Sequence, residues 1–442
     1  MDPHSHYHIL LALLCFHSVA TFHTNQQQTG IVVPIYSSYD ATSHWAVASI
    51  GNPPIHLRLL IDTGSHVTIV PGNNCSRCTS YSSHLYYSSA SSTAKVIPCL
   101  SSSCDDNSCN SKCRYPSSCQ KGKCCDASNP SLCGFFLSYM DGATAEGSLW
   151  RDVLRLESMG SACPFVQTTF GIVTKQTGFW DSFVDGLMGW SYGAVRGFPT
   201  ITSTWLEDWV DQYQTTDLFS ICFGRLKGVI AIGSWDDRLK EGPVFWMDNQ
   251  DIYYYTVALH EVRVDRHTLS SMKRVRAVID SGSTLSFFPS AIFQSLKDVF
   301  LQHYSHLPTL NLSPNILDGF YVLTSDPSDT WPTIEFIFDG VSVSLPPSVY
   351  FYQLVEKGQL VWMFGVQPFS ESYLILGETF MSGLLITHDR QRGLIGFAVP
   401  SPMCSYTGQA TLTPNNYITE PSSSSPVPWI IVILLCVICF AV

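Results

Sequence analysis

The sequence predicts a mainly β protein of two lobes, and three observations lead to this prediction. Short runs of β-branched and aromatic residues recur along the chain and are separated by turn residues, whereas helical patterns are few. One short motif occurs at 59–65 and again at 277–283. The chain has 442 residues, enough for two to three compact units, so each copy of the motif can belong to its own lobe.

The individual elements follow from the same patterns, because strands alternate with period 2 and amphipathic helices with a period near 3.6. The expected strands include 45–50, 56–61, 229–232, 253–264 and 333–338, and the expected helices are 201–213 and 291–303. The expected units are a signal peptide (1–20), a short N-terminal segment (21–40), an N-terminal lobe (41–225) with a cysteine-rich insertion (75–133), a C-terminal lobe (226–405), a Ser/Pro-rich linker (406–428) and an apolar tail (429–442).

Both ends of the chain carry apolar segments. Residues 9–20 are too few to span a bilayer and end in the small-x-small pattern of Ser18 and Ala20, which is typical of a cleaved secretory signal; an uncleaved anchor is the alternative. Residues 429–442 also fall short of the about 20 residues that cross a bilayer, and no Lys or Arg follows them. We expect membrane attachment through a GPI signal, with the small residues 422–425 as the attachment site, or through a short transmembrane helix.

The composition is that of a globular protein, with 45% hydrophobic and 13% charged residues. The formal net charge is −11, and the chain has no run of Lys or Arg that could release counterions from phosphates. Nucleic acid is therefore not expected as a partner.

The cysteines indicate export to an oxidising compartment. Thirteen of the 16 lie outside the terminal apolar segments, and ten of these fall within 75–133. Irregular spacings, including the adjacent Cys124 and Cys125, favour disulfides; a zinc site is the alternative, although this insertion has a single histidine, His84. The odd total leaves at least one thiol without a partner in the same chain. Asn74 and Asn311 begin Asn-x-Ser sequences, which are glycosylation acceptors in exported proteins.

The repeated motif carries the chemistry. An apolar run leads into Asp-Thr-Gly-Ser at 62–65 and into Asp-Ser-Gly-Ser at 280–283. Hydrolysis of an amide by water needs a base for the water proton and an acid for the substrate, and two carboxyls about 3 Å apart supply both because they share one proton. Asp62 and Asp280 are therefore the candidate catalytic residues, and this chemistry needs no metal or cofactor. One copy alone would be an ordinary turn; two copies in matched apolar contexts favour the catalytic pair.

The order of the motifs resembles that of the pepsin family of aspartic proteases, from Trp45 to Cys404. Besides the repeated motif, 45–54 resembles the strand and turn before the family's first catalytic loop, 185–189 and 375–380 resemble the segments that support the two loops, and 393–398 resembles the closing strand. The resemblance implies a bilobal, mainly β fold with an active-site cleft between the lobes. A polypeptide substrate would bind there in an extended conformation.

The resemblance also implies roles for single residues. Ser65 and Ser283 match hydroxyls that bond the catalytic carboxylates, and Gly64 and Gly282 match the backbone N–H groups that do so; simple turn chemistry is the alternative. Tyr139 matches the tyrosine of the flap that covers the substrate, and an aromatic on a hairpin surface is its alternative.

The insertion at 75–133 resembles that of nepenthesin-like plant enzymes and of the plasmepsin V group, and beta-secretase is a more distant relative. The inter-lobe disulfide of beta-secretase implies a Cys222–Cys404 pair here. Three features depart from the family pattern. Ile69 stands where most members have tryptophan, Met140 replaces the glycine after the flap tyrosine, and the segment before residue 31 leaves little room for a basic prosegment.

The expected function is that of an aspartic endopeptidase, monomeric and attached to a membrane at the cell surface or in the secretory pathway. One alternative is a catalytically inactive binding or inhibitor protein on the same scaffold, anchored at a membrane. A second is a disulfide-rich adhesion ectodomain whose insertion binds a partner. The intact Asp62 and Asp280 favour the enzyme.

Overall fold

The computed structural model describes residues 30–38, 43–76, 78, 85–104, 119–120, 123–140, 142–160, 163–178, 183–193, 203–224, 227–270, 272–307, 322–323, 325–328, 330–356, 358–404 and 410–417. The expected signal peptide and apolar tail, together with His84 and Asn311, lie outside these residues. Asn74, the other expected glycosylation acceptor, is exposed on a strand. Among the described residues, no helix has the length and apolar character needed to cross a bilayer.

The first half of the chain forms strands β1 (Ile31–Ser37), β2 (His44–Ile50), β3 (Ile55–Asp62), β4 (Ile69–Ser76), β5 (Lys95–Val96), β6 (Cys119–Gln120), β7 (Lys123–Cys124), β8 (Gly134–Ser138), β9 (Thr144–Leu156), β10 (Val166–Thr177), β11 (Gly186–Gly189) and β12 (Leu218–Phe223), helix α2 (Trp205–Tyr213) and the 3-10 turn η2 (Ser88–Ala90).

The second half forms strands β13 (Lys227–Ile232), β14 (Lys240–Asp248), β15 (Thr256–Val264), β16 (His267–Thr268), β17 (Val275–Ile279), β18 (Ser286–Pro289), β19 (Val322–Leu323), β20 (Ile334–Phe338), β21 (Val341–Leu345), β22 (Phe351–Glu356), β23 (Gln359–Phe364), β24 (Val366–Phe369), β25 (Leu374–Leu376), β26 (Leu385–Asp389), β27 (Leu394–Pro400) and β28 (Thr411–Pro414), helices α3 (Ser290–His303), α4 (Pro347–Tyr350) and α5 (Glu378–Met381), and the 3-10 turns η4 (Asp237–Leu239) and η5 (Pro402–Cys404).

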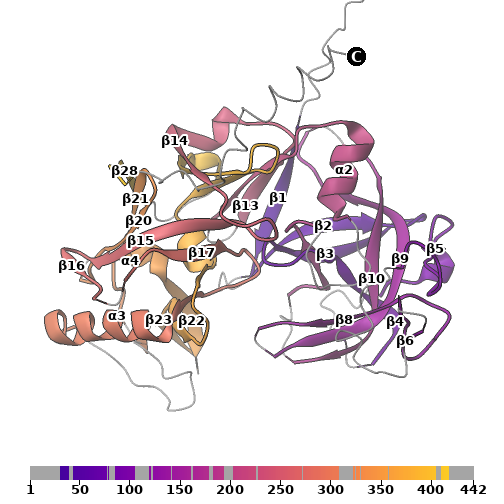
Figure 1. The fold of residues 1–442 in the computed structure, drawn as a ribbon, viewed down its shortest axis with the longest axis horizontal. Coiled ribbons are helices and arrows are strands. Elements are labelled where there is room, and N and C mark those ends of the chain that lie inside the picture. The colour runs from indigo at the N-terminus through magenta and orange to yellow at the C-terminus, as the bar shows by residue number, and fades with distance from the viewer. Residues whose placement is uncertain are drawn as a thin grey trace, which may run out of the picture.

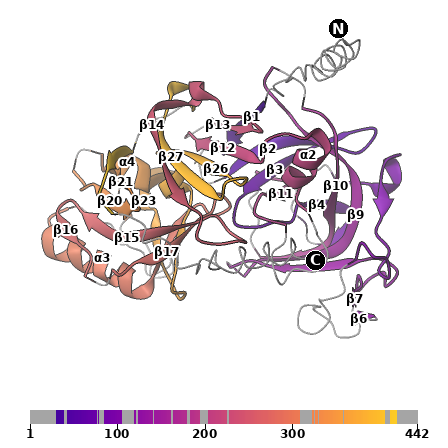
Figure 2. The same ribbon diagram turned by 45° about the horizontal axis from the view of Figure 1, so that its top comes forward.

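Strand pairing confirms the predicted mainly β, two-lobed fold. Among the described residues, 14 strands form one sheet, with the path β14-β27-β26-β12-β13-β1-β2-β3-β11-β4-β10-β9-β5 and with β8 paired to β9. Nine of the described strands form a second sheet, with the path β24-β18-β25-β17-β15-β20-β21-β28 and with β16 paired to β15. Figure 1 shows the strands of the first half on the right and most of those of the second half on the left, with β1 and β13 between them. The strands β14, β27, β26, β12, β13 and β1 connect the two groups (Figure 2).

Helix α2 shows how local sequence sets an element's start. Thr204 caps the helix by accepting from the Glu207 N–H, and the Glu207 side chain accepts from the Thr204 N–H, which together form a capping box. The helix therefore begins at Trp205, four residues later than the expected 201–213. Its buried face, which includes Trp205 and Trp209, packs against β10. The other expected helix, 291–303, corresponds to α3 with one added residue at its start.

Disulfides join cysteines within the insertion and one pair elsewhere. The described pairs are Cys75–Cys78, Cys99–Cys125, Cys104–Cys133 and Cys222–Cys404. Thiols oxidised in this way cannot ligate zinc, so the structure favours disulfides over the metal alternative for these residues. The pair that the resemblance implied joins the end of β12 to η5, and Cys163 is a buried free thiol.

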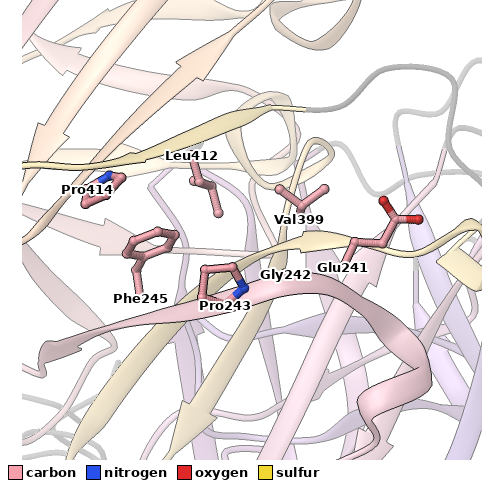
Figure 3. Close-up of a pocket in the computed structure, with 7 residues that line it drawn as sticks. All are labelled: Glu241, Gly242, Pro243, Phe245, Val399, Leu412 and Pro414. Carbon is pink, nitrogen blue, oxygen red and sulfur yellow. The ribbon is translucent and has the colours of Figure 1, made fainter.

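A pocket of about 470 Å³ lies between β14 and β28. In Figure 3, Pro243 and Phe245 of β14, Val399 of β27, and Leu412 and Pro414 of β28 surround it. Its lining includes none of the residues of the repeated motif.

Candidate active site

In both copies of the motif, the aspartate lies at the carboxyl end of a strand. Asp62 ends β3, which pairs in parallel with β11 so that Asp62 lies opposite Gly189. Asp280 follows β17, which pairs in parallel with β25 so that Ile279 lies opposite Leu376. The segments 187–189 and 375–377, each an apolar pair followed by glycine, therefore lie beside the strands that lead to the two aspartates.

Thr63 and Ser281, which follow the two aspartates, bind the loops to each other. The Thr63 hydroxyl accepts from the Ser281 N–H at 2.9 Å and donates to the Ile279 carbonyl at 2.9 Å. Reciprocally, the Ser281 hydroxyl accepts from the Thr63 N–H at 3.0 Å and donates to the Ile61 carbonyl at 2.7 Å. Both side chains are buried, so water does not compete for these four bonds. These four hydrogen bonds fix the separation of the two aspartates.

Each carboxylate is held by the same pair of donors from its own loop. The Gly64 N–H donates to Asp62 Oδ1 at 2.8 Å, and the Ser65 hydroxyl donates to Asp62 Oδ2. In the second loop the glycine N–H donates to Asp280 Oδ1 at 2.9 Å, and the Ser283 hydroxyl donates to Asp280 Oδ2 at 2.7 Å. The two loops therefore present their carboxyl groups in matching orientations.

The glycines show that the two carboxyl groups meet. A Cβ atom built on Gly64 would lie 2.4 Å from Asp280 Oδ1, and one built on Gly282 would lie 2.3 Å from Asp62 Oδ1. Each glycine is thus in contact with the opposite carboxylate, and any larger residue would displace it.

The electrostatics of the pair fit a shared proton. Burial raises the pKa of the Asp62 carboxyl well above its ordinary value, and the adjacent Asp280 raises it further by charge and by hydrogen bonding. Hydrogen bonds from Ser65 and from the Gly64 N–H act in the opposite direction without cancelling the shift. A pair of this kind titrates as a unit, so the proton belongs to both residues.

The comparisons with known proteins agree with this geometry. The family model described as eukaryotic aspartyl protease matches residues 44–98 and 99–400. The chain belongs to the eukaryotic aspartyl protease family. It is 27% identical over 376 residues to aspartic proteinase 39 of Arabidopsis thaliana, covering 79% of this chain and 72% of that protein. It is 24% identical to aspartic proteinase nepenthesin-1 of Nepenthes gracilis (79% and 76% covered) and 24% identical to gastricsin of Macaca fuscata fuscata (82% and 85% covered). The predicted membership of the pepsin family is confirmed.

In this member of the aspartyl protease family, Tyr139 lies at the tip of the hairpin formed by β8 and β9. Its N–H donates to the Ala143 carbonyl at 2.9 Å, and its carbonyl accepts from the Gly142 N–H at 3.1 Å. Gly142 has φ +85°, which favours glycine at this turn. The Tyr139 ring is half-buried against a cluster that includes Ile69, whereas the side chain of Met140 is 61% exposed. Both departures from the family pattern therefore lie at or beneath this hairpin.

The structure brings two further tyrosines near the aspartates that the sequence analysis did not single out. Burial raises the pKa of Tyr254, and negative charge at Asp62 and Asp280 contributes to the rise. Burial likewise raises the pKa of Tyr373, and Asp280 contributes there too. The Tyr-Tyr-Tyr sequence at 253–255 is the available signal, but its aromatic residues also predict a strand. In the structure that strand, β15, begins at Thr256, so the first three residues of the expected strand 253–264 precede it.

Proposed function

We propose that this chain is an aspartic endopeptidase that hydrolyses peptide bonds with a water molecule activated between Asp62 and Asp280. The observation that carries the proposal is the contact of each motif glycine with the opposite carboxylate, because it requires the two carboxyl groups to lie together. Membership of an aspartyl protease family supports peptidase chemistry, and the reciprocal Thr63 and Ser281 bonds support a rigid pair.

In the proposed mechanism the pair acts with one shared proton. The ionised carboxyl removes a proton from the water, and the neutral carboxyl donates its proton to the carbonyl oxygen of the peptide bond as the water oxygen attacks. The carboxyl that took the water proton then donates it to the amide nitrogen, the other carboxyl takes up a proton from one hydroxyl of the tetrahedral intermediate, and the C–N bond breaks to give a carboxylic acid and an amine. The N–H and hydroxyl donors of each loop hold the carboxyl oxygens in place, so little reorganisation is needed during the reaction.

The substrate would lie in extended form between an N-terminal lobe (41–225) that supplies Asp62 and a C-terminal lobe (226–405) that supplies Asp280. Tyr139 would cover it as the tip of a flap, since hairpin tips can move without disturbing the sheet. The nearby Tyr254 and Tyr373 would contact its side chains. The disulfides support an oxidising location, and we propose membrane attachment through the tail at 429–442, by a GPI anchor or a short transmembrane helix.

Cleavage of a mixed peptide library by the purified chain from about pH 3 to about pH 8, with and without a pepstatin-type inhibitor, tests the proposal. Inhibitor-sensitive cleavage would support it and would reveal the preferred side chains. A folded protein that cleaves no peptide at any pH would instead support the inactive binding or inhibitor protein.

The pH profile of this cleavage should be bell-shaped. The raised pKa of Asp62 means that the shared proton is retained in acid and lost as the pH rises through that value, so kcat/KM should fall on the alkaline side. In strong acid the second carboxyl also takes up a proton, no base remains, and kcat/KM should fall again. A rate that increases steadily up to about pH 8 would contradict a one-proton pair.

Replacing Gly64 by Ala should lower kcat/KM about 100-fold, because the added Cβ would force the Asp280 carboxyl to move. Gly383→Ala is the matched control, since the nearest atom to its Cβ would be Ala410 N at 3.1 Å and its φ needs no glycine. Circular dichroism and kinetics on both variants check the prediction. Equal kinetic effects at the two sites would contradict the contact between Gly64 and Asp280.

A further inference from the structure

A buried ion pair lies behind the Asp280 loop. His44 begins β2, and its Nδ1 lies 2.8 Å from Oε1 of Glu378, the first residue of α5. The two side chains are 2% and 4% exposed. Residues so far apart in the chain meet here in the protein interior, where a charge is costly unless it is paired.

Both ring nitrogens of His44 lie close to an oxygen atom. Its Nδ1 faces the carboxylate of Glu378, and its Nε2 lies 3.0 Å from the carbonyl oxygen of Gly224. An imidazolium ring carries an N–H on each nitrogen, so in that form it can face both oxygens as a donor, and its charge pairs with that of Glu378.

The other surroundings of His44 leave Glu378 as the charged group that acts on it within the described residues. The ring of Phe223, at the end of β12, packs against the imidazole with centroids 4.6 Å apart. Ser37 of β1 is the strand partner of His44, and Lys227 of β13 has an exposed side chain. The opposing charge therefore comes from α5, which follows the second copy of the repeated motif in the sequence.

Glu378 is directly connected to the loop that carries Asp280. Its N–H donates to the carbonyl of Ser283 at 2.8 Å, and Ser283 donates its hydroxyl to Asp280. The preceding Gly377 packs so closely that a Cβ there would lie 2.4 Å from the Ser283 carbonyl oxygen. A displacement of Glu378 would therefore reach the catalytic loop through one hydrogen bond and one tight contact.

We propose that His44 and Glu378 form a positioning pair in which protonated His44 holds Glu378, and through it the Asp280 loop, and releases both when it loses its proton. The kinetic part of this inference rests on the proposed peptidase function. The pair would keep the catalytic loop ordered only while His44 is protonated.

The direction of the pH effect follows from the pKa of His44. Burial lowers this pKa, but the charge and hydrogen bond of Glu378 and the Gly224 carbonyl raise it, and the net value is above the ordinary one. The stabilisation by the pair is therefore complete below about pH 6.5, the ordinary value for histidine, and is lost as the pH rises through the raised value. Above it, Glu378 would remain as a buried carboxylate without its counter-ion.

Unfolding by urea between about pH 5 and pH 9, with disulfides intact, tests the pair in the wild type, His44→Gln and Glu378→Gln. In the wild type the free energy of unfolding should decrease with pH above neutrality, with uptake of up to about one proton linked to folding. In both variants the free energy of unfolding should no longer show this decrease with pH above neutrality. His56→Gln is the matched control, because His56 is exposed on β3, and it should keep the wild-type slope.

Kinetics and ring spectroscopy add two readouts that a merely structural residue would not change. At acidic pH, kcat of Glu378→Gln should fall about 10-fold with a smaller change in KM. On the alkaline side of its pH–rate profile, the loss of activity should follow the titration of the aspartate pair alone. In the wild type, ¹⁵N NMR should show both nitrogens of the His44 ring protonated at neutral pH. This readout decides the matter even if a variant does not fold.

The outcomes separate this inference from the proposed function. A chain that cleaves no peptide but shows a protonated His44 and the pH-dependent unfolding would overturn the peptidase and support the ion pair. An active peptidase whose unfolding slope and alkaline limb are unchanged in Glu378→Gln would overturn the positioning pair and leave the peptidase intact. Equal destabilisation of both variants at every pH would also overturn it, because that result indicates packing alone.

Discussion

Replacing Asp280 by Asn should lower kcat/KM for peptide cleavage by about 10⁴-fold, the largest effect of any single change considered. Asn has nearly the shape of Asp, its Oδ1 can still accept from the Gly282 N–H, and its Nδ2 can donate to the Ser283 hydroxyl oxygen, so the loop should keep its structure. It can neither ionise nor hold the shared proton, and the pair loses an acid or a base in every turnover. Asp62→Asn should have an effect of the same size, since the two loops are equivalent.

Steady-state kinetics with a peptide substrate at the pH optimum measures this effect. Asp237→Asn is the matched control, because the Asp237 side chain is 77% exposed in η4 and plays no part in the pair. The double variant with both aspartates replaced should be no slower than either single variant by more than a small factor, because the two groups act as a unit. An Asp280→Asn enzyme that kept a tenth of its activity would exclude the proposed mechanism.

The aspartate pair could be predicted from the sequence because the motif that contains each aspartate occurs twice. Two apolar runs that lead into Asp-[Thr/Ser]-Gly-Ser, each matched by an apolar-apolar-glycine segment, indicate two equivalent loops before any coordinates are known. The strands β3 and β17 and the parallel neighbours β11 and β25 fulfil that pattern. The sequence does not reveal why Gly64 and Gly282 must be glycine. Each of them contacts the carboxylate of the other loop, and this contact is visible only in the structure.

Other parts of the site could not be predicted because they depend on contacts between distant residues with no periodic signature. Nothing in the sequence around His44 or Glu378 indicates that the two meet, and Tyr254 is indistinguishable from a strand residue until β15 is seen to begin after it. The start of α2 was recoverable in principle. Thr204 and Glu207 have the spacing of a capping box, which indicates a first helical residue at 205 instead of the expected 201.

Replacing Arg390 by Met should lower the free energy of unfolding by about 3 kcal/mol, the second large effect. The Arg390 side chain is 2% exposed, donates to Glu207 at the start of α2, and lies 3.4 Å from Asp217. Its guanidinium also packs on the ring of Tyr192 at 4.6 Å, a contact that the Met side chain can partly replace. The substitution therefore mainly removes charge, and two carboxylates that lie mostly inside the protein lose their counter-ion.

Lys175→Met is the matched control, because it removes the same kind of charge from the exposed pair of Lys175 and Glu146, in which the lysine is 40% exposed. That change should cost less than about 1 kcal/mol, since water and salt screen an exposed pair. Urea unfolding of both variants, with disulfides intact, gives the comparison. Arg390 follows β26 and Glu207 belongs to α2, so a large difference would show that a buried ion pair fastens the two halves that carry the aspartates. Similar costs for both variants would mean that burial of Arg390 adds nothing, and that packing of β12 against β26 holds the halves together instead.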